Sequence, residues 1–180
     1  MGNEDFSEMK GTRRFAVTII ATLGLVAIVG SGGGGGGPAA TETINGVVVP
    51  PDPGPAADAT IAGVDADANG IRDDVDRFIA INYGNSAAHL ATARVSAKAL
   101  QAVLLADSAS MEASTRALYA SMDAGVCVAK TLLAAGVAPT PVLNALFAKT
   151  NNTLERINQR TAVTMRAGPI ARSATALVCP

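Results

Sequence analysis

From residue 73 onward, apolar residues recur every three or four positions, the spacing that places them on one face of an α-helix. The pattern predicts four helices, at residues 73–82, 87–106, 111–135 and 141 to about 166. The faces expected to form the core carry Val75, Phe78, Ile79 and Ile81 in the first helix; Leu90, Ala93, Ala97, Leu100 and Leu104 in the second; Leu118, Met122, Gly125, Ala129 and Leu132 in the third; and Leu143, Phe147, Leu154 and Ile157 in the fourth. These faces predict an all-α fold, a small bundle of about four helices.

Polar and turn-forming residues mark the expected helix ends. Ser86 can cap the second helix, and residues 107–110 form a polar break that can cap the third. Thr140 followed by Pro141 pairs a capping threonine with a proline at the first helical position, which predicts the start of the fourth helix. Asn151 and Asn152 can kink that helix, and residues 170–178 can form a final turn or short helix.

The N-terminus has the pattern of a secretory signal. Residues 1–14 are polar and end in basic side chains, and residues 15–30 are apolar apart from threonine. The apolar run is short for a membrane span, so we expect a signal peptide over residues 1–31 and a periplasmic or extracellular location. An uncleaved membrane anchor through residues 15–30 is the alternative. The segment resembles a bacterial lipoprotein signal in which Ser31 replaces the cysteine that would be lipidated.

Residues 32–60 are rich in glycine and proline, a composition that predicts a flexible spacer. A short strand at Val47–Val49 is an alternative for part of it. The spacer leaves residues 61–180 as a single domain of modest size.

Composition supports a helical domain and limits its partners. The chain has 180 residues, of which 49% are hydrophobic and 3% aromatic, with a net charge of −1. Alanine supplies much of the apolar content, which favours closely packed helices. The near-neutral charge, with few clustered basic residues, argues against nucleic acid as a partner.

Residues 65–76 form the one segment with recognisable ligand chemistry. Oxygen-bearing side chains stand at positions one, three, five, nine and twelve, which are Asp65, Asp67, Asn69, Asp73 and Asp76. Gly70 at position six can adopt the positive φ of a sharp turn, and Ile71 at position seven would offer its backbone carbonyl. This is the ligand spacing of an EF-hand calcium loop, so we expect one Ca²⁺ ion here. The alternative is a plain acidic turn in which Asp73 caps the following helix.

The loop has three unusual features: Asp76 in place of glutamate, no helix before it, and no second loop to pair with it. In these it resembles dockerin loops and thrombospondin type 3 repeats. The run from residue 50 to residue 83 is similar to a family of uncharacterised exported bacterial proteins that carry one such loop before a small helical domain. The resemblance implies export and calcium binding.

Two cysteines are present, Cys127 in the third helix and Cys179 next to the C-terminus. An even number of cysteines in an exported chain favours a disulfide, whereas two free thiols would be expected in the cytosol. The bond would hold the C-terminus against the third helix.

The remaining polar residues do not indicate an enzyme. His89 is the only histidine, no GxSxG motif is present, and the one SxxK match, at residues 7–10, lies in the expected signal segment. Glu155, Arg156, Gln159 and Arg160 are expected on a solvated helix face. We expect instead a calcium-stabilised structural or interaction domain, with membrane contact only through an uncleaved N-terminus. The alternative is a dockerin-like adhesion module that binds a protein partner through the loop and the first helix. A docking surface would leave Phe78 or Ile79 exposed, and a structural role would bury both.

Overall fold

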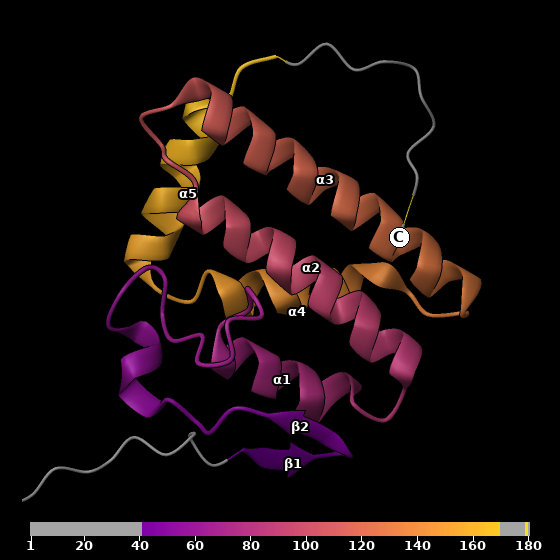
Figure 1. Cartoon of the computed structure of the whole chain (residues 1–180). Coiled ribbons are helices and arrows are strands. Elements are labelled where there is room, and N and C mark those ends of the chain that lie inside the picture. Colours follow the sequence, from indigo (N-terminus) through magenta and orange to yellow (C-terminus); the bar gives the residue numbers. More distant parts are fainter. Residues whose placement is uncertain (1–40, 170–178, 180) are drawn as a thin grey trace, which may run out of the picture. The chain divides into compact units, whose positions relative to one another are not determined.

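The computed structural model describes residues 41–169 and Cys179. These residues form a β-hairpin, a short 3-10 helix and five α-helices (Figure 1). In chain order the elements are β1 (Glu42–Ile44), β2 (Val47–Val49), η1 (Gly54–Asp58), α1 (Asp73–Tyr83), α2 (Ala87–Leu105), α3 (Met111–Ala134), α4 (Pro139–Thr150) and α5 (Leu154–Arg166). The mostly helical fold confirms the expected class. The predicted signal segment and the predicted final turn at residues 170–178 lie outside the described residues.

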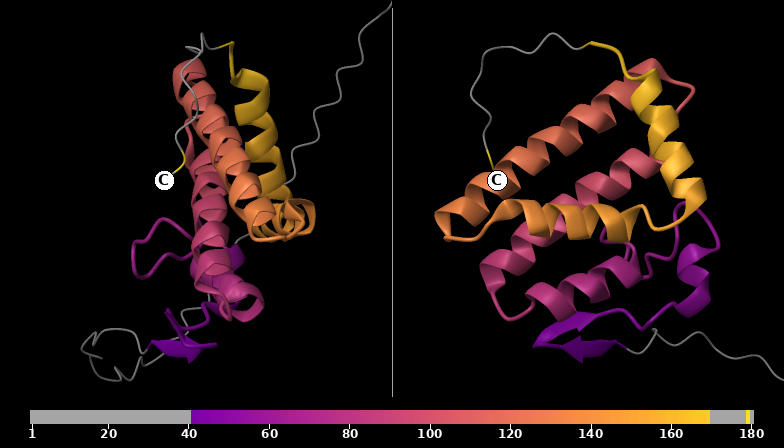
Figure 2. Two further views of the ribbon diagram at one scale, coloured as in Figure 1. Left: turned by 90° about the vertical axis from the view of Figure 1, so that its right-hand side faces the viewer. Right: turned by 180° about the vertical axis from the view of Figure 1, so that it is seen from behind.

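The elements pack around α2. The hairpin, α1, α2 and α3 follow one another as successive layers (Figure 1), and α4 and α5 pack across α2 and α3 on one side (Figure 2). The small side chains of Ala93 and Ala97 are fully buried in α2, which lets the neighbouring elements approach closely. The main core cluster consists of Ile71, Val75, Ile79, Ala93, Ala97, Leu100 and Leu146.

A two-residue turn at Asn45 and Gly46 joins β1 to β2, and Ile44 pairs with Val47 across it. Both turn residues have positive φ, 49° and 78°, as a type I′ hairpin turn requires. Side chains alternate along β2: Val47 and Val49 are buried, and Val48 is 62% exposed. The buried valines pack with Ala80 of α1, which attaches the hairpin to the helices.

The hairpin and η1 lie within residues 32–60, where a flexible spacer was expected. The compact unit begins well before the expected boundary at residue 61, because two strands of this range pair and pack on α1. Val47–Val49 is a strand, although the sequence interpretation preferred a spacer throughout this range.

The first three helices end within one residue of the expected positions. Ser86 caps α2 by accepting a hydrogen bond from the backbone N–H of His89, at 3.4 Å. Ser110 caps α3 in the same way, accepting from the N–H of Ala113 at 3.2 Å. Both caps satisfy backbone donors that the first turn of a helix leaves free.

The expected fourth helix is two helices, α4 and α5. The side-chain nitrogen of Asn151 donates to the carbonyl oxygen of Phe147 at 2.7 Å, which closes α4, and Thr153 caps α5 by accepting from the N–H of Arg156 at 3.3 Å. The predicted start was also wrong. The helix begins at Pro139, whose fixed φ suits a first turn, so Thr140 is not its cap.

Several residues predicted in the core are exposed, and for the two on α5 the cause is the break after α4, which redirects this helix. Val163 is fully buried on α5 instead, together with Arg156. Ile81 lies beyond the buried face of α1, and Met122 lies on the outer face of α3. The exposed residues that were predicted to be buried are Ile81, Met122, Phe147, Leu154 and Ile157.

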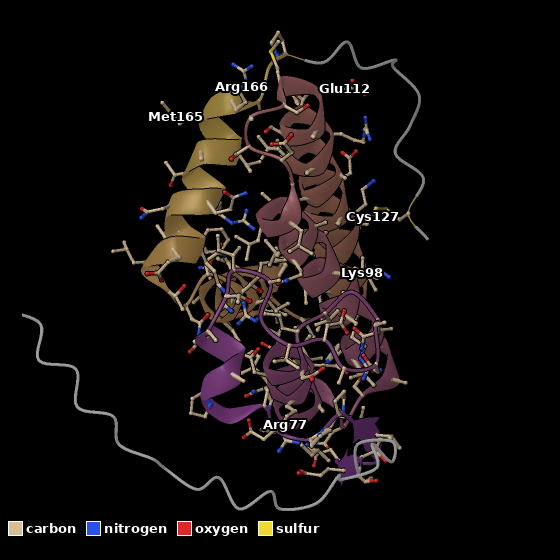
Figure 3. The ribbon with its side chains drawn as sticks, turned by 60° about the vertical axis from the view of Figure 1, so that its left-hand side comes forward. Arg77, Lys98, Glu112, Cys127, Met165 and Arg166 are labelled. Atoms are coloured by element: carbon tan, nitrogen blue, oxygen red, sulfur yellow. A yellow bond between two sulfur atoms is a disulfide. The ribbon has the colours of Figure 1, made fainter. Side chains whose placement is uncertain are left out.

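Cys127 and Cys179 form a disulfide, as predicted, with sulfur atoms 2.08 Å apart and Cα atoms 5.3 Å apart. Cys127 lies on α3 (Figure 3). The bond therefore attaches the C-terminal end of the chain to α3. A structural disulfide is typical of proteins in oxidising compartments outside the cytoplasm.

Candidate metal centre

The structure brings three of the predicted ligands together. Asp65, Asp67 and Asp73 can each offer a carboxylate oxygen such that the three atoms lie within 4.8 Å of one another. Asp65 and Asp67 are exposed, and Asp73 is buried at the start of α1. The group thus has one wall formed by the protein core and one side open to solvent.

The carboxylates also shape the loop that carries them. Asp65 accepts hydrogen bonds from the backbone N–H groups of Asn69 and Gly70, at 3.1 and 2.9 Å. Asn69 donates from its side chain to Asp67 at 3.0 Å and accepts from the N–H of Ile71 at 2.7 Å. Gly70 has the expected positive φ, 85°, so the chain curls back around its own side-chain oxygens.

Asp73 closes the other end of the loop. Its Oδ1 accepts from the N–H of Ala66 at 3.0 Å, and its own N–H donates to the carbonyl oxygen of Val64 at 2.8 Å. Burial raises the pKa of this carboxyl group, and the negative charges of Asp67 and Asp65 raise it further. A cation bound among the three groups would remove that repulsion.

Ile71, the residue expected to offer its carbonyl oxygen, anchors the loop by its side chain, which lies in the main core cluster. A hollow of about 420 Å³ adjoins the loop on the side of Asp67. It gives an ion or water direct access to the open side of the carboxylate group. The hollow is lined by Val48, Asp67, Asn69, Ile71, Arg94, Val95 and Lys98.

Asp76, the predicted twelfth-position ligand, lies apart from the other three carboxylates. It is buried, and Arg94 of α2 binds it, with Nε 2.8 Å from Oδ1 and Nη2 2.9 Å from Oδ2. Both oxygens of Asp76 are therefore engaged by a guanidinium group.

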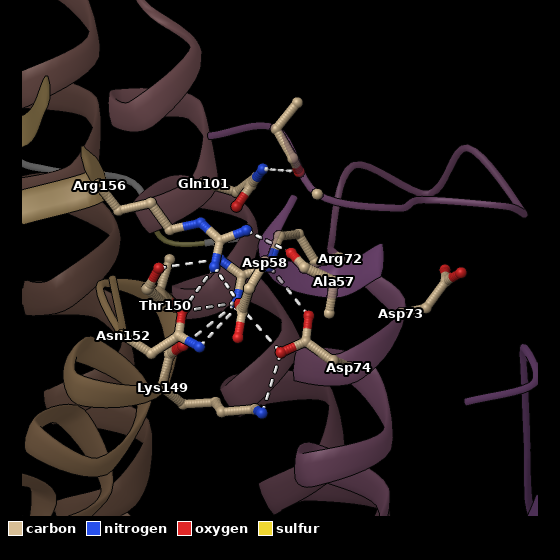
Figure 4. Close-up of polar contacts among 12 residues, drawn as sticks. Ala57, Asp58, Arg72, Asp73, Asp74, Gln101, Lys149, Thr150, Asn152 and Arg156 are labelled. Atoms are coloured by element: carbon tan, nitrogen blue, oxygen red, sulfur yellow. Dashed lines mark hydrogen bonds and ion pairs between the residues drawn. The ribbon is translucent and has the colours of Figure 1, made fainter. Parts of the chain in front are cut away.

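Arg72, inside the loop, is fully buried and joins it to the end of α4 (Figure 4). Its guanidinium binds Asp74 at 2.9 Å and donates to the carbonyl oxygen of Thr150 at 2.9 Å. Lys149 forms a second ion pair with Asp74, at 2.9 Å. Burial by itself raises the pKa of Asp74, but the hydrogen bonds from Arg72 and Lys149 outweigh it, so the pKa is lowered.

Arg156, on α5, holds the segment that leads into the loop. It is fully buried, which corrects the expectation of a solvated helix face. It binds Asp58 at 2.7 Å (Figure 4). It also donates to the carbonyl oxygens of Thr60 at 2.9 Å and Ile61 at 3.1 Å. The side chain of Asn152 donates to Asp58 at 2.9 Å, and hydrogen bonds from Asn152 and Arg156 lower the pKa of Asp58.

Gly63 lies where this segment passes Arg72. Its φ is +67°, and a Cβ atom there would lie 2.3 Å from Cδ of Arg72. Only glycine fits this position without displacing a buried arginine. Two buried arginines therefore fix the candidate metal loop. Arg72 joins the loop to the end of α4, and Arg156 of α5 holds the segment that leads into it.

Sequence reasoning did not identify Arg72, Arg94 and Arg156 as supports of the loop. Their partners are distant in sequence, and no local pattern marks them. The hairpin did have a local signal, Asn45–Gly46 between two apolar residues.

Comparisons of this chain with protein-family models, with curated proteins and with solved structures found no match.

Proposed function

We propose that this chain is an exported structural or interaction protein whose helical domain is stabilised by one calcium ion in the loop of residues 65–76. The observation that carries the proposal is the convergence of Asp65, Asp67 and Asp73 oxygen atoms within 4.8 Å of one another. The convergence occurs in a segment with the ligand spacing of a calcium loop.

The donor set suits a hard divalent cation. Calcium takes six to eight oxygen ligands, and carboxylates, amide oxygens and waters are the usual ones. Asp65, Asp67 and Asp73 would supply charge, while Asn69 and the carbonyl of Ile71 would supply neutral oxygens. The exposure of Asp65 and Asp67 leaves room for water to complete the coordination.

Binding would stabilise the folded domain because the unfolded chain does not hold these groups together. We expect a dissociation constant on the order of 10⁻⁴ M or weaker, as in extracellular calcium modules. At a calcium concentration 100-fold above that constant, the gain in folding free energy is about 2.7 kcal/mol.

The packing of α1 supports a structural role over a dockerin-like docking face. Ile79 is completely buried, and Phe78 packs, partly buried, against the main core cluster. The aromatic ring of Phe78 also makes an edge contact with Tyr83, with ring centroids 6.3 Å apart. Ile79 is therefore withdrawn from a partner, and Phe78 is partly withdrawn.

The disulfide supports export, because such bonds persist in oxidising compartments. A mature N-terminus near Ser31, found by mass spectrometry of the protein from its native compartment, would support cleavage of the signal. Full-length protein recovered only from membranes would support the uncleaved anchor.

Calorimetric titration with calcium tests the proposal. The wild type is expected to bind one ion and to melt at a higher temperature with calcium than with chelator, and Asp67→Ala is expected to lose both effects. Asp52→Ala is a matched control, because both aspartates are exposed and each accepts a hydrogen bond from the backbone N–H two residues ahead. Asp67 accepts from Asn69 at 3.3 Å, and Asp52 accepts from Gly54 at 2.9 Å. Equal calcium responses in Asp67→Ala and wild type would reject this site.

A further inference from the structure

The chain contains two Asn–Gly pairs, Asn45–Gly46 and Asn69–Gly70. In such a pair the glycine nitrogen can attack the side-chain carbon Cγ of asparagine, because glycine has no side chain to hinder the approach. The new N–Cγ bond closes a succinimide ring as the Cγ–Nδ2 bond breaks and ammonia leaves. Water then opens the ring to aspartate or isoaspartate. The reaction needs only water, so it can occur in any aqueous compartment.

The attacking nitrogen is free at the first pair. Asn45 and Gly46 are both exposed at the tip of the hairpin, and the N–H of Gly46 has no hydrogen-bond partner among the described residues. Apart from its two neighbours in the chain, no residue has an atom within 4 Å of the position that a Cβ of Gly46 would take. The turn is therefore open at Gly46, and no hydrogen bond among the described residues engages its nitrogen.

The attacking nitrogen is engaged at the second pair. The N–H of Gly70 donates to the carboxylate of Asp65 at 2.9 Å. The side chain of Asn69 is held at both ends, by Asp67 at 3.0 Å and by the N–H of Ile71 at 2.7 Å. Ring closure here requires all three bonds to break, one of them at the nitrogen that must lose its proton.

We propose that Asn45 is a deamidation site and that its conversion detaches the hairpin from α1, whereas Asn69 is protected by its own loop. The two asparagines differ in surroundings and not in the residue that follows, so the structure, and not the local sequence, sets the difference in rate.

The amide of Asn45 is what joins the turn to α1. Its Nδ2 donates to the carbonyl oxygens of Ala80 and Ile81, both at 3.0 Å. These carbonyls lie near the C-terminus of α1, the negative end of the helix dipole. Aspartate or isoaspartate at this position places a carboxylate against two carbonyl oxygens, so two hydrogen bonds are replaced by repulsion.

The loss of ammonia makes the change irreversible, and it follows a detachment that is reversible. The side chain of Asn45 must leave Ala80 and Ile81 before Cγ can reach the nitrogen of Gly46. A two-stranded hairpin is only marginally stable by itself, so brief detachment is expected. Each conversion then removes the amide that would return the hairpin to α1, and the apolar cluster of Val47, Val49 and Ala80 is opened.

The rate is tested on the full-length oxidised protein, incubated in warm, mildly alkaline buffer and digested at intervals for mass spectrometry. Both sites are measured in one digest. Asn45 should convert at least about tenfold faster than Asn69, the factor that corresponds to breaking one hydrogen bond to a charged group. Equal rates, a faster Asn69, or no conversion of Asn45 under conditions that convert a synthetic peptide of the same sequence would overturn the proposal.

The consequence is tested with Asn45→Asp. Its hairpin amides should lose protection from hydrogen exchange while the helical circular dichroism is kept. Asn85→Asp is the matched control, since it adds the same charge just after α1, at an exposed asparagine without a hydrogen-bonding partner among the described residues. It should keep the protection. Wild-type protection in Asn45→Asp, or equal loss in both variants, would show that the amide does not hold the hairpin.

Discussion

Arg94 binds both carboxylate oxygens of Asp76, at 2.8 and 2.9 Å, and so joins α2 to α1 at the residue expected to complete the calcium loop. The pair is unequal in its surroundings. Asp76 is 1% exposed in its side chain, and Arg94 is 33% exposed. Removing the arginine would leave a buried carboxylate without its cation.

Arg94→Ala is therefore expected to lower the free energy of unfolding in chelator by about 2–4 kcal/mol, somewhat less than for a fully buried pair. Because a divalent cation can then neutralise Asp76, calcium should raise the melting temperature of this variant more than that of the wild type. Thermal melts in calcium and in chelator measure both effects. Lys130→Ala, on α3, removes an exposed cation without an ion pair among the described residues and should match the wild type. A smaller calcium effect in Arg94→Ala would show that Asp76 does not serve the ion.

Asp73→Asn is expected to stabilise the calcium-free protein at neutral pH and to abolish the calcium response. Burial and neighbouring carboxylates raise the pKa of Asp73 above its ordinary value of 3.8, so its contribution to stability is fully present below pH 3.8 and is lost as the pH rises through the folded-state pKa. Asparagine removes the charge and keeps an acceptor for the N–H of Ala66. Denaturant unfolding in chelator measures the change; a variant less stable than the wild type at neutral pH would contradict it.

The ion pairs of Asp74 should make the domain sensitive to acid. The pKa of Asp74 is lowered from 3.8, despite burial, by Arg72 and Lys149. A lowered folded-state pKa adds stability above pH 3.8, and this stability is lost as the pH falls from there through the folded-state value. Unfolding free energies measured across this range should therefore fall less steeply for Asp74→Asn than for the wild type. Parallel curves for the two proteins would rule out this origin of acid sensitivity.

Arg156→Lys is expected to lower the free energy of unfolding by about 3 kcal/mol or more, although it keeps the charge. A lysine cannot reproduce the planar donors that reach Asp58 and the carbonyl oxygens of Thr60 and Ile61. Arg116→Lys is the control, because the one ion pair of Arg116 among the described residues is an exposed pair with Glu112. It should change stability by no more than about 0.5 kcal/mol. Equal effects of the two substitutions would mean that Arg156 is not a specific support.

Reduction of the Cys127–Cys179 disulfide is expected to lower stability by about 4 kcal/mol in the chain-entropy model, given a separation of 52 residues. The double variant Cys127→Ser and Cys179→Ser should melt at the temperature of the reduced wild type. Differential scanning calorimetry with and without reductant measures the effect. A wild type indifferent to reductant would show that the bond adds no stability.

The features predictable from the sequence are those whose causes lie close together along the chain. Ser86 and Ser110 cap helices within three residues of themselves, and the ligand spacing from Asp65 to Asp73 is contained in one loop. Asn151 was recognised as a point of distortion, but whether it kinks or ends a helix depends on its contact with Phe147 and on the cap made by Thr153.

The features that could not be predicted depend on distant partners. Arg156 stands among polar residues of α5 and has the sequence pattern of a solvated face, yet Asp58, 98 residues earlier, makes its burial favourable. Asp76 fits the twelfth position of the loop by spacing, and its pairing with Arg94 follows only from the packing of α1 on α2.

The supports of the acidic loop come from the far end of the chain. Arg156 reaches Ala57 across 99 residues, and Arg72 reaches Thr150 across 78. Contacts between such distant residues form late in folding, because closing a long loop has to precede them. For a chain exported N-terminus first, as we propose, the carboxylates of the loop emerge well before the helix that holds them in place. The complete site would then form only after α5 had crossed the membrane and packed against the rest of the domain. Calcium would therefore act on the last step of folding and not on the first.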